Sequence, residues 1–150
     1  MRYGISAAAL IVQNEQLLLV NHRFDEQHDF WIPPGGKLEG EESIFDCAKR
    51  EVYEETGLDV TLDRILYIQE FVQSDYHFCK FFILASSVRG KLTLDHLTED
   101  EDFLKEARFF AQPDLQSMDV RPTVLKEQFW HDWTAGAQAT HYLGLQRVQG

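Results

Sequence analysis

Basic residues, cysteines and long apolar runs are all scarce in this chain. Lysine and arginine number 14 against 25 aspartates and glutamates, which gives a formal net charge of −11. A nucleic-acid groove needs a basic footprint, so no nucleic acid polymer is expected as a partner. The two cysteines, Cys47 and Cys79, have no CxxC spacing and are too few for a disulfide framework, so we expect reduced thiols and no zinc site.

Segments that would direct the chain to a membrane are also missing from the sequence. The first apolar run is short and is broken by Gln13 and Asn14, so no signal peptide is expected. No run approaches the length of a membrane span, and no repeat or linker divides the chain. With 44% hydrophobic residues among 150, we expect one cytoplasmic domain over residues 1–150.

The stretch that organises the chain is Gly35–Leu58, which reads GGKLEGEESIFDCAKREVYEETGL. Two glycines after a pair of prolines predict a loop whose backbone can approach a ligand closely. Ser43 is a suitable N-cap, and Gly57 can supply the left-handed residue that ends a helix. The sequence therefore predicts a helix between these two residues.

Three glutamates fall on one side of this predicted helix. At about 100° per residue, Glu51, Glu54 and Glu55 share an arc of roughly 100°, beside an apolar stripe. Glu51 and Glu55 stand at i and i+4, where like charges repel each other. A divalent cation is the natural compensation, because carboxylate oxygens are the ligands that hard cations prefer.

The rest of the chain predicts strands and short helices around this segment. The predicted strands are Ile5–Val12, Gln16–Asn21, Leu62–Val72, Tyr76–Val88 and Glu106–Phe110. The first two are almost continuously apolar, which indicates burial on both faces of a sheet. Prolines open a short helix, Asp114–Met118, and a longer one from Pro122 to about Thr134. For Tyr142–Leu145 a strand and a partner contact both stay open. This order predicts an α/β fold with a mixed sheet.

These residues closely resemble the motif of the Nudix (MutT-like) hydrolase family. The motif asks for Gly, five residues, Glu, seven residues, Arg-Glu, an aliphatic residue, any residue, Glu-Glu, any residue, Gly and an aliphatic residue. The chain satisfies every position with Gly36, Glu42, Arg50, Glu51, Val52, Glu54, Glu55, Gly57 and Leu58. The resemblance implies an α/β/α sandwich around a mixed β-sheet. It also implies Mg²⁺- or Mn²⁺-dependent hydrolysis of a nucleoside diphosphate linked to another group.

The resemblance further implies roles for individual residues. Glu51 and Glu55 are the leading metal ligands, Glu54 is a further ligand or a partner of one, and the Gly35 carbonyl is an extra ligand. Arg50 would orient a glutamate of the set. The remaining motif residues, Gly36, Glu42 and Gly57, would be structural, with Glu42 supporting the junction of loop and helix.

The base and the phosphate contacts are less closely specified. Glu51 is the first choice for the general base, and Glu99 or Glu101 of the acidic segment Asp95–Asp102 is the second. Arg23 and Lys37 are candidate phosphate contacts, although each is equally explained as ordinary surface charge.

The substrate stays open between several nucleotides. In relatives, a tyrosine some distance after the motif goes with dinucleoside polyphosphates, and Tyr76 favours this class. ADP-ribose, nucleoside triphosphates and nucleotide sugars remain alternatives. So do two other functions on the same fold: a nucleotide-sensing module without catalysis, and a diphosphate isomerase. Relatives are often dimers, which leaves a homodimer open.

Overall fold

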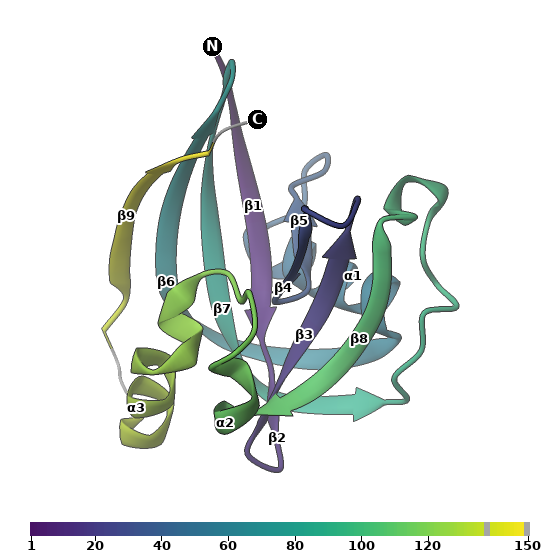
Figure 1. Cartoon of the computed structure of the whole chain (residues 1–150), viewed down its shortest axis with the longest axis vertical. Coiled ribbons are helices and arrows are strands. Elements are labelled where there is room, and N and C mark those ends of the chain that lie inside the picture. The colour runs from purple at the N-terminus through teal and green to yellow at the C-terminus, as the bar shows by residue number, and fades with distance from the viewer. Residues whose placement is uncertain (137–138, 149–150) are drawn as a thin grey trace.

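A computed structural model describes residues 1–136 and 139–148, and shows two β-sheets packed side by side with helices on either side (Figure 1). The strands are β1 (Arg2–Leu10), β2 (Val12–Gln13), β3 (Gln16–Arg23), β4 (Asp29–Ile32), β5 (Gly35–Lys37), β6 (Leu58–Gln73), β7 (Tyr76–Gly90), β8 (Leu104–Ala111) and β9 (His141–Arg147). The helices are α1 (Ile44–Thr56), α2 (Gln112–Leu115) and α3 (Gln128–Ala135), with 3₁₀ helices η1 (Glu99–Glu101) and η2 (Thr123–Lys126).

The larger sheet has the strand order β5-β1-β7-β6-β9 and is mixed. Its β1–β7 and β6–β9 pairs are parallel, whereas β1–β5 and β6–β7 are antiparallel. In the smaller sheet β3 pairs antiparallel with β2, β4 and β8. The predicted α/β architecture with a mixed sheet between helices is confirmed.

Strand β1 is buried on both faces, as its continuous apolar pattern predicts. Ala9 packs in a cluster with Val52 of α1, whereas Leu10 packs in a different cluster with Phe129 of α3. Because successive strand residues point to opposite faces, α1 and α3 must cover opposite sides of this layer. The layered sandwich follows from that alternation.

Helix α1 begins and ends where its capping residues predict. The Ser43 hydroxyl accepts a hydrogen bond from the Asp46 N–H at 3.0 Å, and the helix ends at Gly57 with φ of 75°. A side chain at position 57 would also place its Cβ 2.4 Å from Thr93 Cγ2. Both ends of the helix that carries the glutamates are therefore fixed by local chemistry.

Two predictions about elements were wrong. The helix expected from Pro122 to Thr134 is interrupted at Glu127, whose φ of −136° and ψ of −67° are not helical, so that η2 and α3 are separate. The loop expected at the two glycines after the prolines contains strand β5, which pairs with β1, and strand β4 before the prolines, which pairs with β3, was not predicted. Tertiary pairing gives these short segments the extended structure that their composition does not predict.

The segment Tyr142–Leu145, for which a strand was one of two alternatives, is part of strand β9. This strand pairs in parallel with β6 at the edge of the large sheet. Tyr142 and Leu145 on this strand are 60% and 42% exposed.

Both cysteines are free thiols, as expected, and burial raises the pKa of Cys47 to about 12. None of the helices in the described ranges has the length and apolarity that a membrane crossing requires.

Candidate active site

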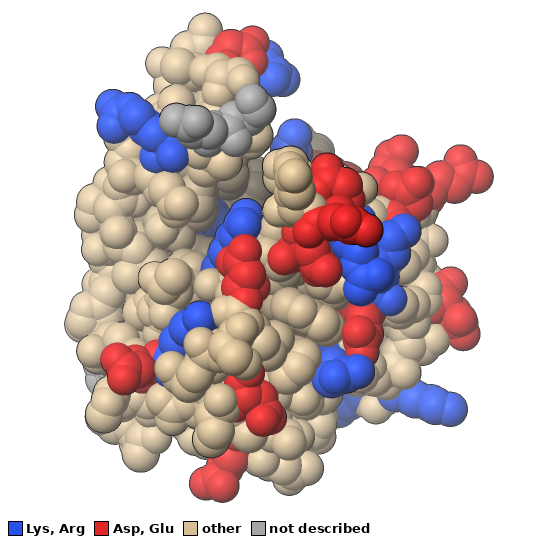
Figure 2. Space-filling model, in the orientation of Figure 1, with Lys and Arg blue, Asp and Glu red and all other residues tan. Residues whose placement is uncertain are grey.

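The glutamates of α1 line a cleft of about 300 Å³, which we call the acidic cleft. It is lined by His22, Gly35, Gly36, Glu39, Glu51, Glu54, Glu55, Thr98, Asp100, Glu101, Phe103 and Leu104. These residues come from β3, β5, the loop before α1, α1 itself, and the segment from Thr98 to the start of β8. Figure 2 shows acidic side chains gathered on this part of the surface, at the upper right of the view.

Three carboxylates converge in the acidic cleft. One oxygen from each of Glu51, Glu54 and Glu101 lies within 4.8 Å of the others. Glu101 comes from η1, far along the chain, and its carboxylate accepts hydrogen bonds from the Thr98 N–H at 3.1 Å and the Thr98 hydroxyl at 2.9 Å. The capping interaction of a short 3₁₀ helix thus fixes the third carboxylate opposite α1.

Glu55 lies deeper and is incompletely paired. One of its oxygens accepts a hydrogen bond from the Gly35 N–H at 3.2 Å, and the other is buried without a partner among the described residues. Burial, together with the neighbouring Glu51, raises the pKa of Glu55 well above its ordinary value. Burial also raises the pKa of Glu54. An unpaired carboxylate oxygen beside three other carboxylates fits a divalent cation, which would satisfy it.

Arg50 ties the acidic residues to one another. Its guanidinium donates to Glu42 at 2.8 and 3.1 Å, to Glu51 at 2.9 Å and to Glu54 at 3.3 Å. The hydrogen bonds from Arg50 are the main reason that the pKa of Glu42 falls to about 2. Glu42 also accepts from the Glu39 N–H at 2.9 Å, so it joins the loop before α1 to the helix.

Gly36 leaves the space that the Glu51 carboxylate occupies. A Cβ at position 36 would lie 2.6 Å from the carboxyl carbon of Glu51. The glycine therefore leaves room for the Glu51 carboxylate beside β5, and is not needed for a left-handed backbone.

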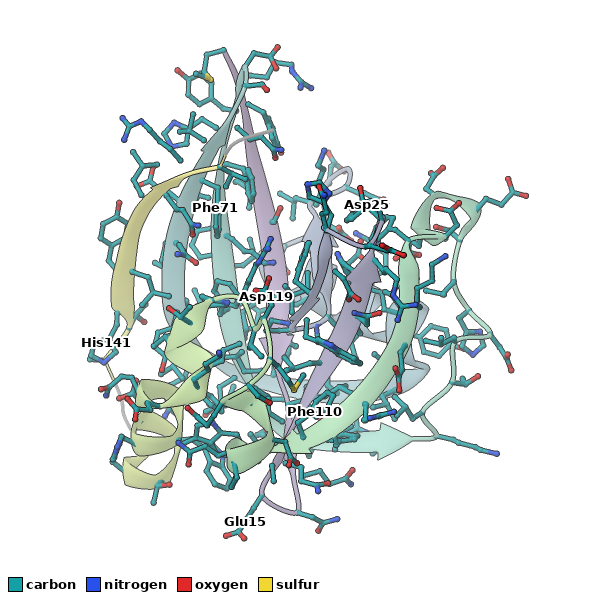
Figure 3. All side chains as sticks on the ribbon, viewed as in Figure 1. Glu15, Asp25, Phe71, Phe110, Asp119 and His141 are labelled. Carbon is teal, nitrogen blue, oxygen red and sulfur yellow. The ribbon has the colours of Figure 1, made fainter. Side chains whose placement is uncertain are left out.

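A second cavity, of about 450 Å³, lies on the face of the large sheet that is turned away from α1, and we call it the aromatic pocket. It is lined by Phe30, Ile32, Gln69, Phe71, Phe78, Lys80, Phe82, Asp119, Val120, Arg121, Pro122, Thr123, Gln146 and Val148. Phe71 and Phe78 pair across β6 and β7 and stack at 5.0 Å. Figure 3 labels Phe71 on the sheet and Asp119 on the segment facing it.

The acidic cleft and the aromatic pocket are neighbours. The Phe30 ring of the aromatic pocket lies 5.6 Å from the His22 ring, which lines the acidic cleft. Burial lowers the pKa of His22 to about 4, with the charge of Lys80 as a second cause, so this imidazole is neutral near pH 7. The linings of the two cavities therefore meet at the His22 and Phe30 rings.

The predicted site residues do not all meet in these cavities. Arg23 pairs with Asp29 at 3.3 Å on the surface, and the Lys37 ammonium lies 4.9 Å from the centre of the Tyr76 ring. Tyr76 stacks on Phe78 at 5.3 Å, so it touches a residue of the aromatic pocket without lining it. Of the two candidates in the acidic segment, Glu101 reaches the carboxylate cluster, whereas Glu99 does not line the described cleft.

Sequence reasoning missed the polar residues of the aromatic pocket. Gln69 and Lys80 lie within strands that were predicted from their apolar residues. Arg121 lies between two segments predicted to be helical. Arg121 packs over the Phe30 ring at 3.9 Å and pairs with Asp119 at 3.0 Å. The available signal was an ionisable residue, Lys80, in the middle of an otherwise apolar strand.

Solved structures resemble this fold over nearly its whole length. The E. coli ORF135 protein superposes with a TM-score of 0.73 at 19% identity, covering 93% of this chain and 96% of that one. A MutT NUDIX hydrolase from Burkholderia pseudomallei gives a TM-score of 0.71 at 22% identity, covering 85% and 98%. At these identities the likeness establishes the fold alone.

Curated relatives match shorter stretches. The 8-oxo-dGDP phosphatase NUDT18 of Danio rerio is 31% identical over 97 residues, which is 65% of this chain and 29% of the relative. The human diphosphoinositol polyphosphate phosphohydrolase NUDT4B is 40% identical over 83 residues, 53% of this chain and 44% of the relative. This chain thus matches less than half the length of either relative. The family model for the NUDIX domain matches residues 2–128, and the chain therefore belongs to the NUDIX family.

Proposed function

We propose that this chain is a divalent-metal-dependent hydrolase that cleaves a diphosphate bond in a nucleoside diphosphate linked to another moiety. One observation carries the proposal. The convergent oxygens of Glu51, Glu54 and Glu101, with the unpaired oxygen of Glu55 behind them, lie in a cleft that adjoins an aromatic pocket. The first cavity suits a metal-bound diphosphate, and the second suits a flat ring.

Four carboxylates would hold Mg²⁺ or Mn²⁺: Glu51, Glu54, Glu55 and Glu101. Gly35 lines the same cleft, and its carbonyl is proposed as a further ligand. The bound metal would offset negative charge on the phosphate oxygens and acidify a water molecule. The raised pKa values of Glu54 and Glu55 mean that these groups exchange protons for the cation when it binds.

Glu51 is the proposed general base, and Arg50 is proposed as the residue that positions it. The hydrogen bond from Arg50 at 2.9 Å fixes one carboxylate oxygen of Glu51, and the other oxygen is left for a water molecule. Arg50 also contacts Glu54 at 3.3 Å, so one guanidinium orients two carboxylates. Glu101 is the second candidate for the base, since it is brought opposite Glu51.

The aromatic pocket is the proposed seat of the nucleobase. The rings of Phe71, Phe78 and Phe82 offer the apolar surface on which a base can pack, and the pocket is large enough for one base. Tyr76 favours dinucleoside polyphosphates among the substrate classes, and its place beside Phe78 would let it extend the aromatic surface. Two relatives are named for 8-oxo-dGDP and for diphosphoinositol polyphosphate. These names support a diphosphate substrate without favouring one substrate class.

A substrate panel tests the proposal. The compounds are a dinucleoside polyphosphate, ADP-ribose, nucleoside triphosphates, a nucleotide sugar, a methylated cap analogue and a diphosphoinositol polyphosphate, each with Mg²⁺. Release of phosphate-containing products from at least one nucleotide, abolished by chelator, is the expected result. Reaction in ¹⁸O-labelled water identifies the phosphorus that is attacked.

A nucleotide-sensing module without catalysis is the second candidate, and the panel separates it from the enzyme. A sensor would bind one of these compounds in the aromatic pocket and release no product. An isomerase would change a diphosphate compound without taking up labelled oxygen. The complete set of motif carboxylates favours the hydrolase over both.

A further inference from the structure

Lys80 is an ionisable residue in the middle of the large sheet. It lies on β7 with Phe78 and Phe82 two residues away on either side, so all three face the aromatic pocket. Its cross-strand neighbours are Gln69 on β6 and the small residue Ser6 on β1. The side chain therefore rises from the floor of the aromatic pocket.

The Lys80 ammonium has no carboxylate partner among the described residues. The contact that the structure gives it is with the Phe82 ring, whose centre lies 5.2 Å away. Beside it Gln69 is 9% exposed, and its side-chain oxygen is buried without a hydrogen bond in the described parts of the chain. A buried oxygen without a partner is costly, and the half-buried Lys80 beside it has no carboxylate partner, so these two side chains indicate a place that a polar ligand occupies.

Three arginines near the two cavities are already paired with carboxylates. Arg121 contacts Asp119 at 3.0 Å, and Arg23 contacts Asp29 at 3.3 Å. Arg50 is bound to Glu42, Glu51 and Glu54. Lys80 thus differs from these three arginines, because it forms no ion pair with a carboxylate among the described residues.

The charge of Lys80 reaches the acidic cleft. Burial lowers its pKa to about 8, while Glu55 and Glu51 oppose this effect by raising it. Lys80 in turn contributes to the lowered pKa of His22, which lines the acidic cleft. The strand register agrees with this, because Ser6 on β1 pairs with Lys80 on one side and with β5 on the other, and β5 carries Gly35 and Gly36 of the acidic cleft.

We propose that Lys80 binds the phosphate group that joins the nucleoside in the aromatic pocket to the diphosphate in the acidic cleft. The inference rests on the proposed function, since it assumes a nucleoside in that pocket. A lysine offers a compact charge with three donors, which suits the oxygens of a phosphate in any rotation. The phosphate would supply the acceptor that the Lys80 ammonium lacks.

The test compares a nucleoside with its own 5′-monophosphate, without metal. Binding of adenosine and AMP, guanosine and GMP, and cytidine and CMP is measured by calorimetry in the presence of chelator. The pair that wild-type protein binds best is then measured on Lys80→Met, which keeps length and removes charge. We expect roughly a tenfold to hundredfold loss of monophosphate affinity, as for a charge-assisted hydrogen bond, and less than about a twofold change for the nucleoside.

Two further variants complete the design. Lys80→Arg should restore part of the monophosphate affinity, because it restores the charge. Lys91→Met is the matched control, since it makes the same substitution at an exposed lysine that lines neither cavity, and both affinities should then stay as in wild type. Both ligands are measured on the same variant, so a smaller folded fraction would affect both measurements alike. It would not produce a loss confined to the monophosphate.

Three results would overturn the proposal. An equal loss for nucleoside and monophosphate in Lys80→Met would mean that Lys80 contacts the base or only supports the pocket. An unchanged affinity for both would mean that it contacts neither. If wild-type protein binds no nucleoside and no monophosphate, the seat assigned to the nucleobase is wrong, and the role of Lys80 fails with it.

Discussion

Glu51 and Glu55 stand one turn apart on α1, yet their surroundings differ. Glu51 accepts a hydrogen bond from Arg50 at 2.9 Å, whereas Glu55 accepts one from the Gly35 N–H and keeps one buried oxygen without a partner among the described residues. Their spacing on one helix face was predictable from sequence. Their unequal partners were not, because Gly35 and Glu101 reach them only through the tertiary fold.

The first prediction concerns Glu51. Glu51→Gln should lower turnover with saturating Mg²⁺ by on the order of 10²–10⁴, because an amide cannot accept the proton of the attacking water. The measurement is kcat on the best substrate of the panel. Glu41→Gln, an exposed glutamate just before α1, is the control and should leave kcat unchanged. Near-normal turnover of Glu51→Gln would remove this residue from the role of base.

The second prediction concerns the stability of the metal-free protein. Because the pKa of Glu55 is raised by folding above its ordinary value of 4.5, the carboxyl ionises more readily in the unfolded chain. Its unfavourable contribution is therefore absent below pH 4.5 and grows as pH rises toward the raised folded pKa. Glu55→Gln cannot ionise and keeps the acceptor for Gly35, so it should be more stable than wild type at pH 8.

Thermal unfolding in chelator measures this difference. At pH 8 the variant should melt a few degrees higher, since about 1 kcal/mol moves the midpoint of a domain of this size by roughly 2–4 °C. At pH 4 the two midpoints should coincide. Added Mg²⁺ should stabilise wild type more than the variant at pH 8. A variant that melts below wild type at pH 8 would show that the Glu55 carboxylate is satisfied without metal.

At the scale of elements, the site depends on how β5 approaches α1. Sequence patterns located α1 accurately because its caps, Ser43 and Gly57, are local signals. They missed β5 and β4, since both are short and lie next to prolines, and their extended structure comes from pairing with β1 and β3. The acidic cleft was therefore predictable on its helical side only.

The third prediction tests this approach of β5 to α1. Gly36→Ala would place a Cβ 2.6 Å from the Glu51 carboxyl carbon, at the movable end of a side chain. The carboxylate should shift while the backbone stays in place, so turnover should fall by roughly tenfold to a hundredfold, as for a misplaced catalytic group. Thermal stability should change by less than about 1 kcal/mol, typical of a change outside the core. Full activity of Gly36→Ala would show that the Glu51 carboxylate can accommodate the added Cβ and still function.

The 3₁₀ helix η1 determines which residue of the acidic segment reaches the carboxylate cluster. Glu101 reaches the carboxylate cluster because Thr98 holds it with two hydrogen bonds, at 3.1 and 2.9 Å. From sequence, Glu99 and Glu101 were equivalent members of an acidic segment. Only the turn of a 3₁₀ helix separates the residue that reaches the cluster from the one that does not.

At the scale of the molecule, the family motif fixed both the fold class and the location of the acidic cleft. The aromatic pocket is different, because its lining comes from β4, β6, β7, β9 and the segment before η2. No local pattern brings these segments together, so neither the pocket nor Lys80 could be located before the fold was known. Substrate choice depends on that part of the molecule, which is why the sequence left it open.

The whole arrangement also predicts a pH dependence of metal binding. Protons on Glu54 and Glu55, whose pKa values are raised by burial, compete with the cation. Mg²⁺ affinity should therefore increase as pH rises through the raised pKa values, and chelator should abolish activity at every pH. Calorimetric titrations from pH 5 to pH 9 measure the trend. An affinity independent of pH would contradict proton release on binding.

The proposed function depends on a divalent cation held by the α1 carboxylates and Glu101 beside the aromatic pocket. Crystals soaked in Mn²⁺ would locate this cation, because anomalous scattering identifies manganese without reference to activity. We expect an anomalous peak in contact with oxygens of Glu51, Glu54, Glu55 or Glu101. A cleft without such a peak at saturating Mn²⁺, with these carboxylates still held as they are by Arg50, Gly35 and Thr98, would contradict it.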